Sequence, residues 1–339
     1  MDSLSNTSTT DRAPFGSCLF VTLGCAKNEV DTDRMRALLI NAGFDEVRDV
    51  DDADVVIINT CSFLASATSE SIEATLELAD DVSEGVRRRP IVMCGCVPSR
   101  YGAELAAQLP EVAAFVRADE EDGIVAVVRD VLGMGGASFS NEATSRALRT
   151  VEGASAYVKI SEGCDRFCAF CAIPRIRGRY ASRPEGEILS EVERLMEGGA
   201  REVVLIGQDT GIWGSDLGGG RTLAWLLREV AAAVRPYGAW VRVLYLQPEG
   251  MTDELIATIR DTEEVLSYID IPIQHCDERV LASMGRTGSI DRLRALFDRL
   301  RSEIPGMVLR TTGMVGFPGE TDDQADELLD FFREQEFDY

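Results

Sequence analysis

The chain has 339 residues, enough for about two domains of ordinary size. Its 34 Lys and Arg residues against 58 Asp and Glu residues give a net charge of −24, which repels nucleic-acid phosphates and favours basic partners. His275 is the single histidine, which disfavours catalytic triads and histidine-rich metal sites. The nine cysteines are odd in number and follow no signal peptide, so they indicate reduced thiols that bind metal in a cytoplasmic protein without a membrane span.

The first half of the chain alternates between strand and helix patterns. Residues 1–13 are rich in Ser, Thr and Asp and predict a disordered tail. Residues 14–135 predict a small doubly wound α/β domain, because continuous apolar runs alternate with helical spacing. The expected strands are 17–24, 53–60 and 90–95, and the expected helices are 31–42, 72–78 and 101–109. Residues 136–154 are Gly- and Ser-rich and predict a linker.

The second half repeats the alternation in five longer units over residues 155–339. No Rossmann glycine loop accompanies them, so they predict a partial (β/α) barrel with its chemistry at the carboxyl ends of the strands. The expected strands are 156–161, 202–207, 240–246, 268–273 and 307–315. The expected helices are 185–198, 222–234, 252–260, 290–302 and 321–335.

The sharpest motif is C-x3-C-x2-C, formed by Cys164, Cys168 and Cys171 directly after the first strand of the second domain. Three thiolates at this spacing can hold one iron–sulfur cluster and leave one of its four irons open. The alternatives are buried thiols or a zinc site, which needs a fourth ligand such as His275 or a distant cysteine.

A second cysteine set is spread more widely. Cys25, Cys61 and Cys96 each follow one of three predicted parallel strands. Ligands of open α/β sheets gather at the carboxyl ends of the strands, so the three cysteines are candidates for one shared cluster. Buried structural cysteines are the alternative, and Cys94, which period-two alternation places on the same face as Cys96, is the competing choice. The other cysteines are interpreted as packing residues: Cys18, Cys94 and Cys276.

The C-x3-C-x2-C motif after the first strand of a β/α barrel resembles the radical S-adenosylmethionine (SAM) superfamily. In that superfamily the open iron binds the amino and carboxylate groups of SAM, which an electron from the cluster cleaves to a 5′-deoxyadenosyl radical. The segment GMVGFPGE at 313–320 resembles the superfamily's G-x-I-x-G-x-x-E signature near the adenine. The segment GQD at 207–209 occupies the place of its Gly-Gly-Glu loop for the amino group. The resemblance implies the cluster ligands Cys164, Cys168 and Cys171 and the SAM contacts Phe170, Gly207, Gln208, Gly316 and Glu320.

The first domain resembles the amino-terminal domain of the methylthiotransferase family. The matching segments are TLGCAKN at 22–28, NTC at 59–61 and GC at 95–96. This resemblance implies that Cys25, Cys61 and Cys96 hold an auxiliary [4Fe-4S] cluster beside the SAM-binding one. It also implies a reaction that replaces C–H by C–S–CH3, in which one SAM supplies a methyl group to sulfur at the auxiliary cluster and a second supplies the radical.

The residues around the motifs distinguish two branches of this family. Segments 22–31, 160–166 and 207–210 resemble the branch that modifies the β-carbon of an aspartate in protein twelve of the small ribosomal subunit. The tRNA branch usually has Gln-Met-Asn after its first cysteine and Gln-Asn-Val at the position of 208–210. The implied partners are a basic ribosomal protein, free or within the ribosome, and an electron donor such as flavodoxin or ferredoxin, with only incidental nucleic-acid contact. A tRNA adenosine methylthiotransferase and a non-catalytic iron–sulfur scaffold or sulfur carrier are the alternatives.

An arginine-rich segment follows the motif. Residues 164–183 contain five arginines and one aspartate, a local charge of +4. It is interpreted either as a solvated loop or as a rim in which Arg177 and Arg179 bind a carboxylate or phosphate. His275 either faces the cavity or is a structural histidine.

The end of the sequence falls short of the family's pattern. The superfamily's partial barrel has six strands, and a small β domain called TRAM follows them in the methylthiotransferases. The resemblance therefore predicts a chain truncated before strand six, with an exposed edge on its fifth strand.

Overall fold

The computed structural model describes residues 15–80, 89–135, 151 and 153–339, which fold as two compact units. Among these residues, the first unit comprises 15–24 and 31–135, and the second comprises 25–30, 151 and 153–339. Six residues from the first half of the sequence thus pack with the second unit. The predicted tail and most of the predicted linker lie outside the described residues.

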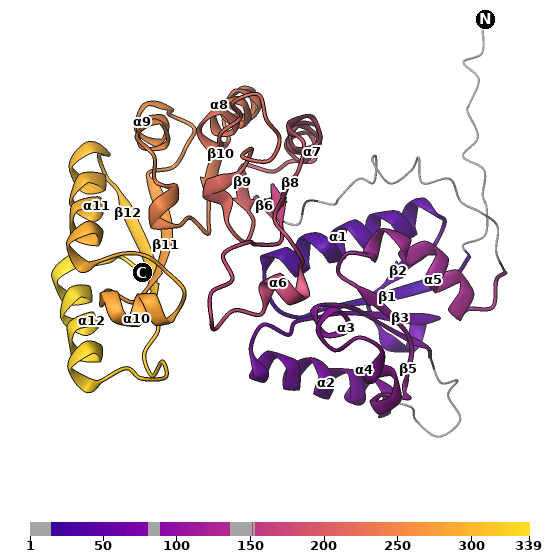
Figure 1. Cartoon of the computed structure of the whole chain (residues 1–339). Helices are drawn as coiled ribbons and strands as arrows, with labels where there is room; N and C mark the ends of the chain where they lie inside the picture. Colours follow the sequence, from indigo (N-terminus) through magenta and orange to yellow (C-terminus); the bar gives the residue numbers. More distant parts are fainter. Residues whose placement is uncertain (1–14, 81–88, 136–150, 152) are drawn as a thin grey trace, which may run out of the picture. The chain divides into compact units, whose positions relative to one another are not determined.

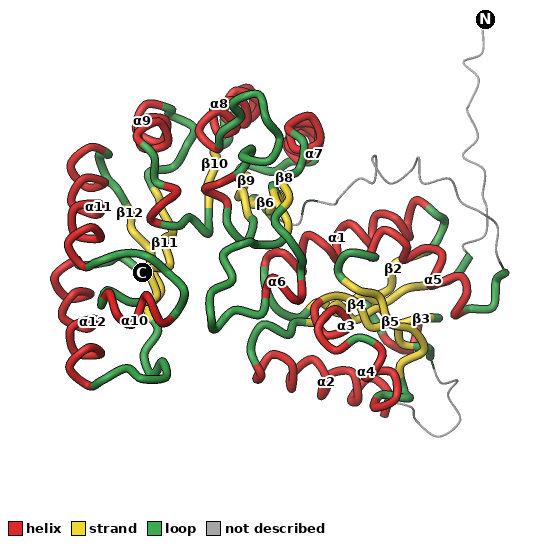
Figure 2. The backbone as a smooth tube through the Cα atoms, viewed as in Figure 1, coloured by secondary structure: helices red, strands yellow, loops and turns green. Residues whose placement is uncertain are grey.

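The first unit is built on a parallel five-stranded sheet in the order β2-β1-β3-β4-β5. Val55 and Ile57 pack into one apolar cluster and Val56 and Ile58 into another, so helices cover both faces of the sheet (Figure 2). This covering explains the uninterrupted apolar runs of the central strands. The strands are β1 Ser17–Thr22, β2 Asp45–Val47, β3 Val55–Thr60, β4 Ile91–Gly95 and β5 Val112–Arg117. The helices are α1 Ala26–Asn41, α2 Ala65–Asp80, α3 Cys96–Tyr101, α4 Ala103–Gln108 and α5 Ile124–Val131.

The predicted doubly wound sheet is confirmed, but several details of the prediction are wrong. The helix expected at 101–109 is replaced by α3, which begins at Cys96, and α4, which begins at Ala103. The three-residue strand β2 and the strand β5 were not expected, and neither was the helix α5. The helix expected from residue 31 begins at Ala26, directly after Cys25. Its first turn carries the polar residues Lys27 and Asn28, so the apolar spacing that marks the rest of the helix is missing there.

The second unit is a partial barrel of parallel strands (Figure 1). One sheet has the order β10-β9-β6, β11 pairs with β12, and the bridge between Val241 and Val265 links the two sheets. The strands are β6 Ser155–Lys159, β9 Glu202–Ile206, β10 Trp240–Val243, β11 Tyr268–Gln274 and β12 Val308–Gly313. The long helices line their outer side: α7 Glu185–Glu197, α8 Leu223–Val234, α9 Asp253–Asp261, α11 Ile290–Glu303 and α12 Asp322–Gln335. The short elements are β7 Ser161–Glu162, α6 Ile173–Ile176, β8 Ala181–Ser182 and α10 Glu278–Ser283.

The two faces of the barrel strands have different partners. Leu205 of β9 lies in the large apolar cluster formed with the outer helices. Its neighbours Val204 and Ile206 point to the opposite face, because side chains alternate along a strand. There they pack against Ala26 and Val30 from the first turn of α1.

The expected exposed edge on β12 is partly covered. The N–H of Thr311 donates to the carbonyl of Tyr339 at 3.0 Å, and the N–H of Asp338 donates to the carbonyl of Leu309 at 3.0 Å. These bonds place the end of the sequence alongside β12. Within the described part of the chain, no helix is long and apolar enough to cross a membrane.

Candidate active site

The C-x3-C-x2-C loop leaves the hairpin formed by β7 and β8. Gly163, just before the motif, has φ of +71°, and a Cβ atom there would lie 2.2 Å from the carbonyl oxygen of Arg179. Only glycine fits this approach. The N–H of Cys164 donates to the carbonyl of Gly178 at 3.3 Å, which joins the two arms of the loop at the motif.

The rest of the loop is fixed to α10. The N–H of Ala169 donates to the carbonyl of Met284 at 2.9 Å, just past the end of that helix. Cys164 is buried and Cys168 and Cys171 are half-buried, as is the neighbouring Phe170. Burial raises the pKa of the Cys164 and Cys171 thiols above the ordinary value. Binding to a metal would supply the charge that favours their thiolate forms.

The donor set fits an iron–sulfur cluster. Among the described residues, no three Cys, His, Asp or Glu side chains are arranged around a point where a single ion would bind. The cysteines that hold a [4Fe-4S] cluster bind different irons, so they stand farther apart than the ligands of one ion. The three thiols of the C-x3-C-x2-C loop are ligands of the type that such a cluster needs, and one anchored loop carries all three.

Arg166, inside the motif, ties the loop to the ends of two strands. Its Nε lies 2.5 Å from Oδ2 of Asp209, after β9, and its Nη1 lies 3.0 Å from Oε2 of Glu249, after β10. Asp209 is fully buried, and burial raises the pKa of its carboxyl group. The other carboxylate oxygen of Asp209 and the amide oxygen of Gln208 are buried without a hydrogen-bond partner. These two acceptors fit a donor such as an ammonium group.

Gly207 packs tightly at the same strand end. A Cβ atom on Gly207 would lie 2.4 Å from Oγ of Ser161. Gly207, just after β9, therefore packs against the side chain of Ser161 in β7.

The GMVGFPGE segment forms a turn that Glu320 holds in place. The Glu320 carboxylate accepts from the N–H of Phe317 at 2.8 Å and lies 3.2 Å from Nε2 of His275. Because the N–H of Asp277 donates to Nδ1 of His275, the proton of a neutral ring is on Nε2, which donates to Glu320. His275 is fully buried and also lines a pocket with Glu249 and Arg286, so it both holds the turn and faces a cavity. Nothing lies within 4 Å of where a Cβ on Gly316 would stand, so this side of the turn is open.

The other three candidate ligands lie at strand ends of the first sheet. Cys25 follows β1, Cys61 follows β3, and Cys96 is the first residue after β4. These three strands are neighbours, and the direction in which the strand order runs along the chain reverses between β1 and β3. Ligands of open α/β sheets bind at the carboxyl ends of strands at such a reversal.

The expected alternation between Cys94 and Cys96 is wrong. Gly95 has φ of +91° and ends β4, and a Cβ atom there would lie 2.2 Å from Oδ1 of Asn59. The strand period is therefore broken before Cys96. Cys94 is completely buried in an apolar cluster, where burial raises the pKa of its thiol.

The remaining two cysteines also lie in apolar clusters. Cys18 packs in the core of the first unit and Cys276 in that of the second. Burial raises the pKa of each thiol to about 12. Neutral thiols in such surroundings act as small apolar side chains.

The arginine-rich segment does not form one continuous rim. The Arg177 side chain is 2% exposed and lies 3.6 Å from the Glu162 carboxylate. Arg179 is 74% exposed and pairs with Asp165 at 2.9 Å. Arg183 pairs with Glu191 at 2.8 Å. Of the two arginines expected to bind an anion, only Arg179 presents its side chain to solvent.

Sequence reasoning missed the contacts of residues 27 and 28. The ammonium group of Lys27 lies 3.2 Å from the ring centroid of Tyr245, and burial lowers the pKa of that lysine to about 8. Asn28 is fully buried and accepts from Arg177. Both residues belong to the TLGCAKN segment, so the motif marked their position without indicating their partners.

Two family models match the chain. The Radical SAM superfamily matches residues 158–332, and Uncharacterized protein family UPF0004 matches residues 17–117. A protein from Syntrophus aciditrophicus is 42% identical over 330 residues, which cover 94% of this chain and 72% of the relative. A protein from Geobacter sulfurreducens is 41% identical over 325 residues, with 94% and 72% covered. Both are named ribosomal protein uS12 methylthiotransferase RimO.

Solved structures share the fold at low sequence identity. The radical SAM methyltransferase TsrM from Kitasatospora setae has a TM-score of 0.70 and 13% identity, covering 95% of this chain and 71% of TsrM. The cobalamin-dependent SAM radical enzyme OxsB has a TM-score of 0.62 and 12% identity, covering 94% of this chain and 52% of OxsB. With the sequence relatives, the chain therefore belongs to the radical SAM methylthiotransferase family that includes the RimO proteins, a family of enzymes that carry two [4Fe-4S] clusters and use SAM.

Proposed function

We propose that this chain transfers a methylthio group to the β-carbon of an aspartate in ribosomal protein uS12, the protein that appears in the names of its relatives. The observation that carries the proposal is the presence of two cysteine triads, one following the neighbouring parallel strands β1, β3 and β4 and one on the single loop between β7 and β8. A single iron–sulfur centre would account for one triad only.

Each triad would hold one cluster. Cys164, Cys168 and Cys171 would hold the cluster that binds SAM. The auxiliary cluster would be held by Cys25, Cys61 and Cys96. When bound, these groups supply an electron, a carbon-centred radical and the methylthio group.

The chain's own residues orient the cofactor. The unpartnered oxygens of Gln208 and Asp209 would accept from the ammonium group of SAM. Arg166 fixes Asp209 and keeps this part of the loop at the ends of β9 and β10. The open side of the turn at Gly316, which Glu320 holds in place, leaves room for a planar ring. Phe170, next to the last cysteine of the motif, would contact SAM, as the family resemblance implies.

The partners follow from the substrate and the charge. A net charge of −24 attracts a basic ribosomal protein and disfavours tRNA. The electron donor would be a flavodoxin or ferredoxin, and nucleic-acid contact would be incidental. Modification of a ribosomal protein would take place in the cytoplasm, where cysteines stay reduced.

The proposal is tested by offering both substrate classes to the anaerobically reconstituted protein. Small ribosomal subunits and bulk tRNA are incubated separately with protein, SAM and reductant, and the products are weighed by mass spectrometry. A methylthio gain on a uS12 aspartate that disappears in Cys168→Ala supports the proposal. A gain on tRNA adenosine alone would instead support the tRNA alternative, and iron binding without SAM cleavage would support the scaffold alternative.

A further inference from the structure

Residues 25–30, here called the Cys25 segment, pack within the barrel unit. Ala26 and Val30 join Val204 and Ile206 in an apolar cluster on the barrel face opposite the outer helices. Lys27 lies over the ring of Tyr245 in the same unit. The segment that carries one cysteine of the first-half triad is therefore anchored to the strands beneath the C-x3-C-x2-C loop.

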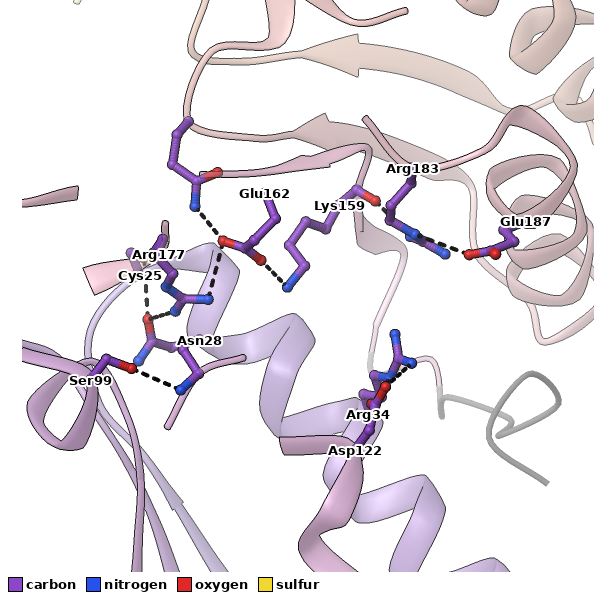
Figure 3. A network of polar contacts seen from close by, with 12 residues as sticks. Cys25, Asn28, Arg34, Ser99, Asp122, Lys159, Glu162, Arg177, Arg183 and Glu187 are labelled. Carbon is purple, nitrogen blue, oxygen red and sulfur yellow. Dashed lines mark hydrogen bonds and ion pairs between the residues drawn. The ribbon is translucent and has the colours of Figure 1, made fainter. Parts of the chain in front are cut away.

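Arg177 forms the polar part of this anchor (Figure 3). Its Nη2 donates to Oδ1 of Asn28 at 3.2 Å, and its Nη1 lies 3.6 Å from Oε1 of Glu162. Oδ1 of Asn28 also accepts from the thiol of Cys25 at 3.5 Å. A guanidinium that is almost wholly buried is costly unless its partners stay in place, so this contact strongly favours one arrangement of the Cys25 segment.

Glu162 is the centre of the contact. It is the second residue before Cys164, where the C-x3-C-x2-C motif begins. Its carboxylate also lies 2.5 Å from Nζ of Lys159 and accepts from Nε2 of Gln208 at 2.8 Å. One carboxylate thus joins the end of β6, the residue after Gly207 and, through Arg177, the Cys25 segment.

We propose that Arg177, held by Glu162, is a positioning residue that fixes the Cys25 thiol relative to the C-x3-C-x2-C loop. This proposal rests on the proposed function, because it takes Cys25 as a ligand of the auxiliary cluster. Arg177 acts through Asn28, which lies three residues after Cys25 in the first turn of α1, so that Arg177 holds the backbone that carries Cys25. A ligating Cys25 has no thiol proton, so its hydrogen bond to Asn28 belongs to the cluster-free protein.

Hydrogen exchange on the iron-loaded protein tests the anchor directly. In Arg177→Ala, the amides of residues 29–32 are expected to exchange at least tenfold faster, while those of residues 36–40, farther along α1, keep the wild-type rate. Arg179→Ala is the matched control, because it removes the same charge two residues away from an exposed side chain. Equal protection of residues 29–32 in Arg177→Ala and wild type would overturn the proposal.

Two further variants, Asn28→Ala and Arg177→Lys, show whether the effect of Arg177→Ala comes from misfolding. Asn28→Ala removes the shared acceptor without burying a new unpaired carboxylate, and it is expected to loosen the same amides at least tenfold. Arg177→Lys keeps the charge beside Glu162 but loses the planar fork, so it is expected to fall between wild type and Arg177→Ala. Loosening of all of α1 to the same degree in these variants would indicate general instability and contradict the proposal.

A spectroscopic test connects the anchor to the cluster. In a background in which Cys164, Cys168 and Cys171 are all replaced by Ala, only the auxiliary cluster can form. Its electron paramagnetic resonance spectrum after reduction is expected to change with Arg177→Ala and to stay unchanged with Arg179→Ala. An unchanged spectrum in both would refute a role in positioning Cys25. If Arg177→Ala shows the hydrogen-exchange effect but the wild-type protein never modifies uS12, the proposed substrate is wrong while the proposed role of Arg177 is supported.

Discussion

Replacement of Glu320 by Ala removes the carboxylate that holds the turn at 313–320. The Glu320 side chain is 4% exposed and accepts from the N–H of Phe317 and from the ring of His275. Each buried donor left without a partner costs about 1–3 kcal/mol, and Phe317 is only half-buried, so water can satisfy part of the loss. We therefore expect Glu320→Ala to lower the free energy of unfolding by about 2–4 kcal/mol.

Thermal melts of the iron-loaded protein measure this loss. In a unit of this size, each kcal/mol lowers Tm by about 2–4 °C, which predicts a decrease of about 4–16 °C. Glu320→Gln is the matched variant. Phe317 and His275 donate to different oxygens of Glu320, and Gln keeps only one of these oxygens. Its NH2 group therefore faces the other donor, since the N–H of Asp277 keeps the His275 proton on Nε2. Its Tm is therefore expected to lie between those of Glu320→Ala and wild type.

The affinity of the Glu320 variants for SAM shows whether Glu320 holds the turn at 313–320 or binds SAM directly. If Glu320 acts by holding the turn, the loss of affinity follows the loss of Tm across the two variants. A Glu320→Ala protein that melts within about 1 °C of wild type would refute the reasoning. So would a Glu320→Gln protein of normal Tm that binds SAM as weakly as Glu320→Ala.

Three further predictions concern the cysteines and one glycine. Cys168→Ala is expected to lower the iron content, measured colorimetrically, from about eight to about four atoms per chain, whereas Cys94→Ala is expected to leave it near eight. Equal losses of iron in the two variants would contradict the assignment of Cys168 as a cluster ligand and of Cys94 as a packing residue. Gly163→Ala forces a Cβ atom against the carbonyl oxygen of Arg179. The reconstituted variant is therefore expected to lose the cluster of the C-x3-C-x2-C loop, with about half of its iron and of its visible absorption. Iron content and absorption equal to those of wild type would refute this prediction. Burial raises the pKa of Cys18 to about 12, so the unfolded chain releases this proton first as pH rises above 9, and stability falls between about pH 9 and 12. Cys18→Val is expected to reduce the decrease in Tm between about pH 8 and pH 10, and an unchanged decrease would exclude this thiol as its source.

The sequence predicted the features whose causes are local. β3 and β4 are continuous apolar runs, because both of their faces are buried. The cysteines at 164, 168 and 171 are close in sequence, so their spacing alone predicts a cluster loop. By contrast, β2 has the sequence DEV and is largely exposed, so its three residues carry no strand pattern.

The contacts that position the site could not be predicted, because they join distant parts of the chain. Arg177 and Asn28 are 149 residues apart, and no local pattern relates them. The sequence placed Arg177 in a solvated loop or at an anion-binding rim because arginines are frequent in this segment. The structure shows that the Arg177 side chain is buried and pairs with Glu162. His275 and Glu320, 45 residues apart, meet only because β11 and β12 pair in parallel.

The central claim is that the chain replaces a hydrogen on an aspartate of uS12 by a methylthio group. The most direct measurement is the mass of that peptide after reaction with SAM that carries deuterium in its methyl group, with 5′-deoxyadenosine counted in the same sample. The account predicts a peptide that gains one labelled methylthio group in place of one hydrogen, with at least one 5′-deoxyadenosine formed per modified aspartate. A labelled methyl group without sulfur on the peptide, or a methylthio product on tRNA with none on uS12, would contradict it.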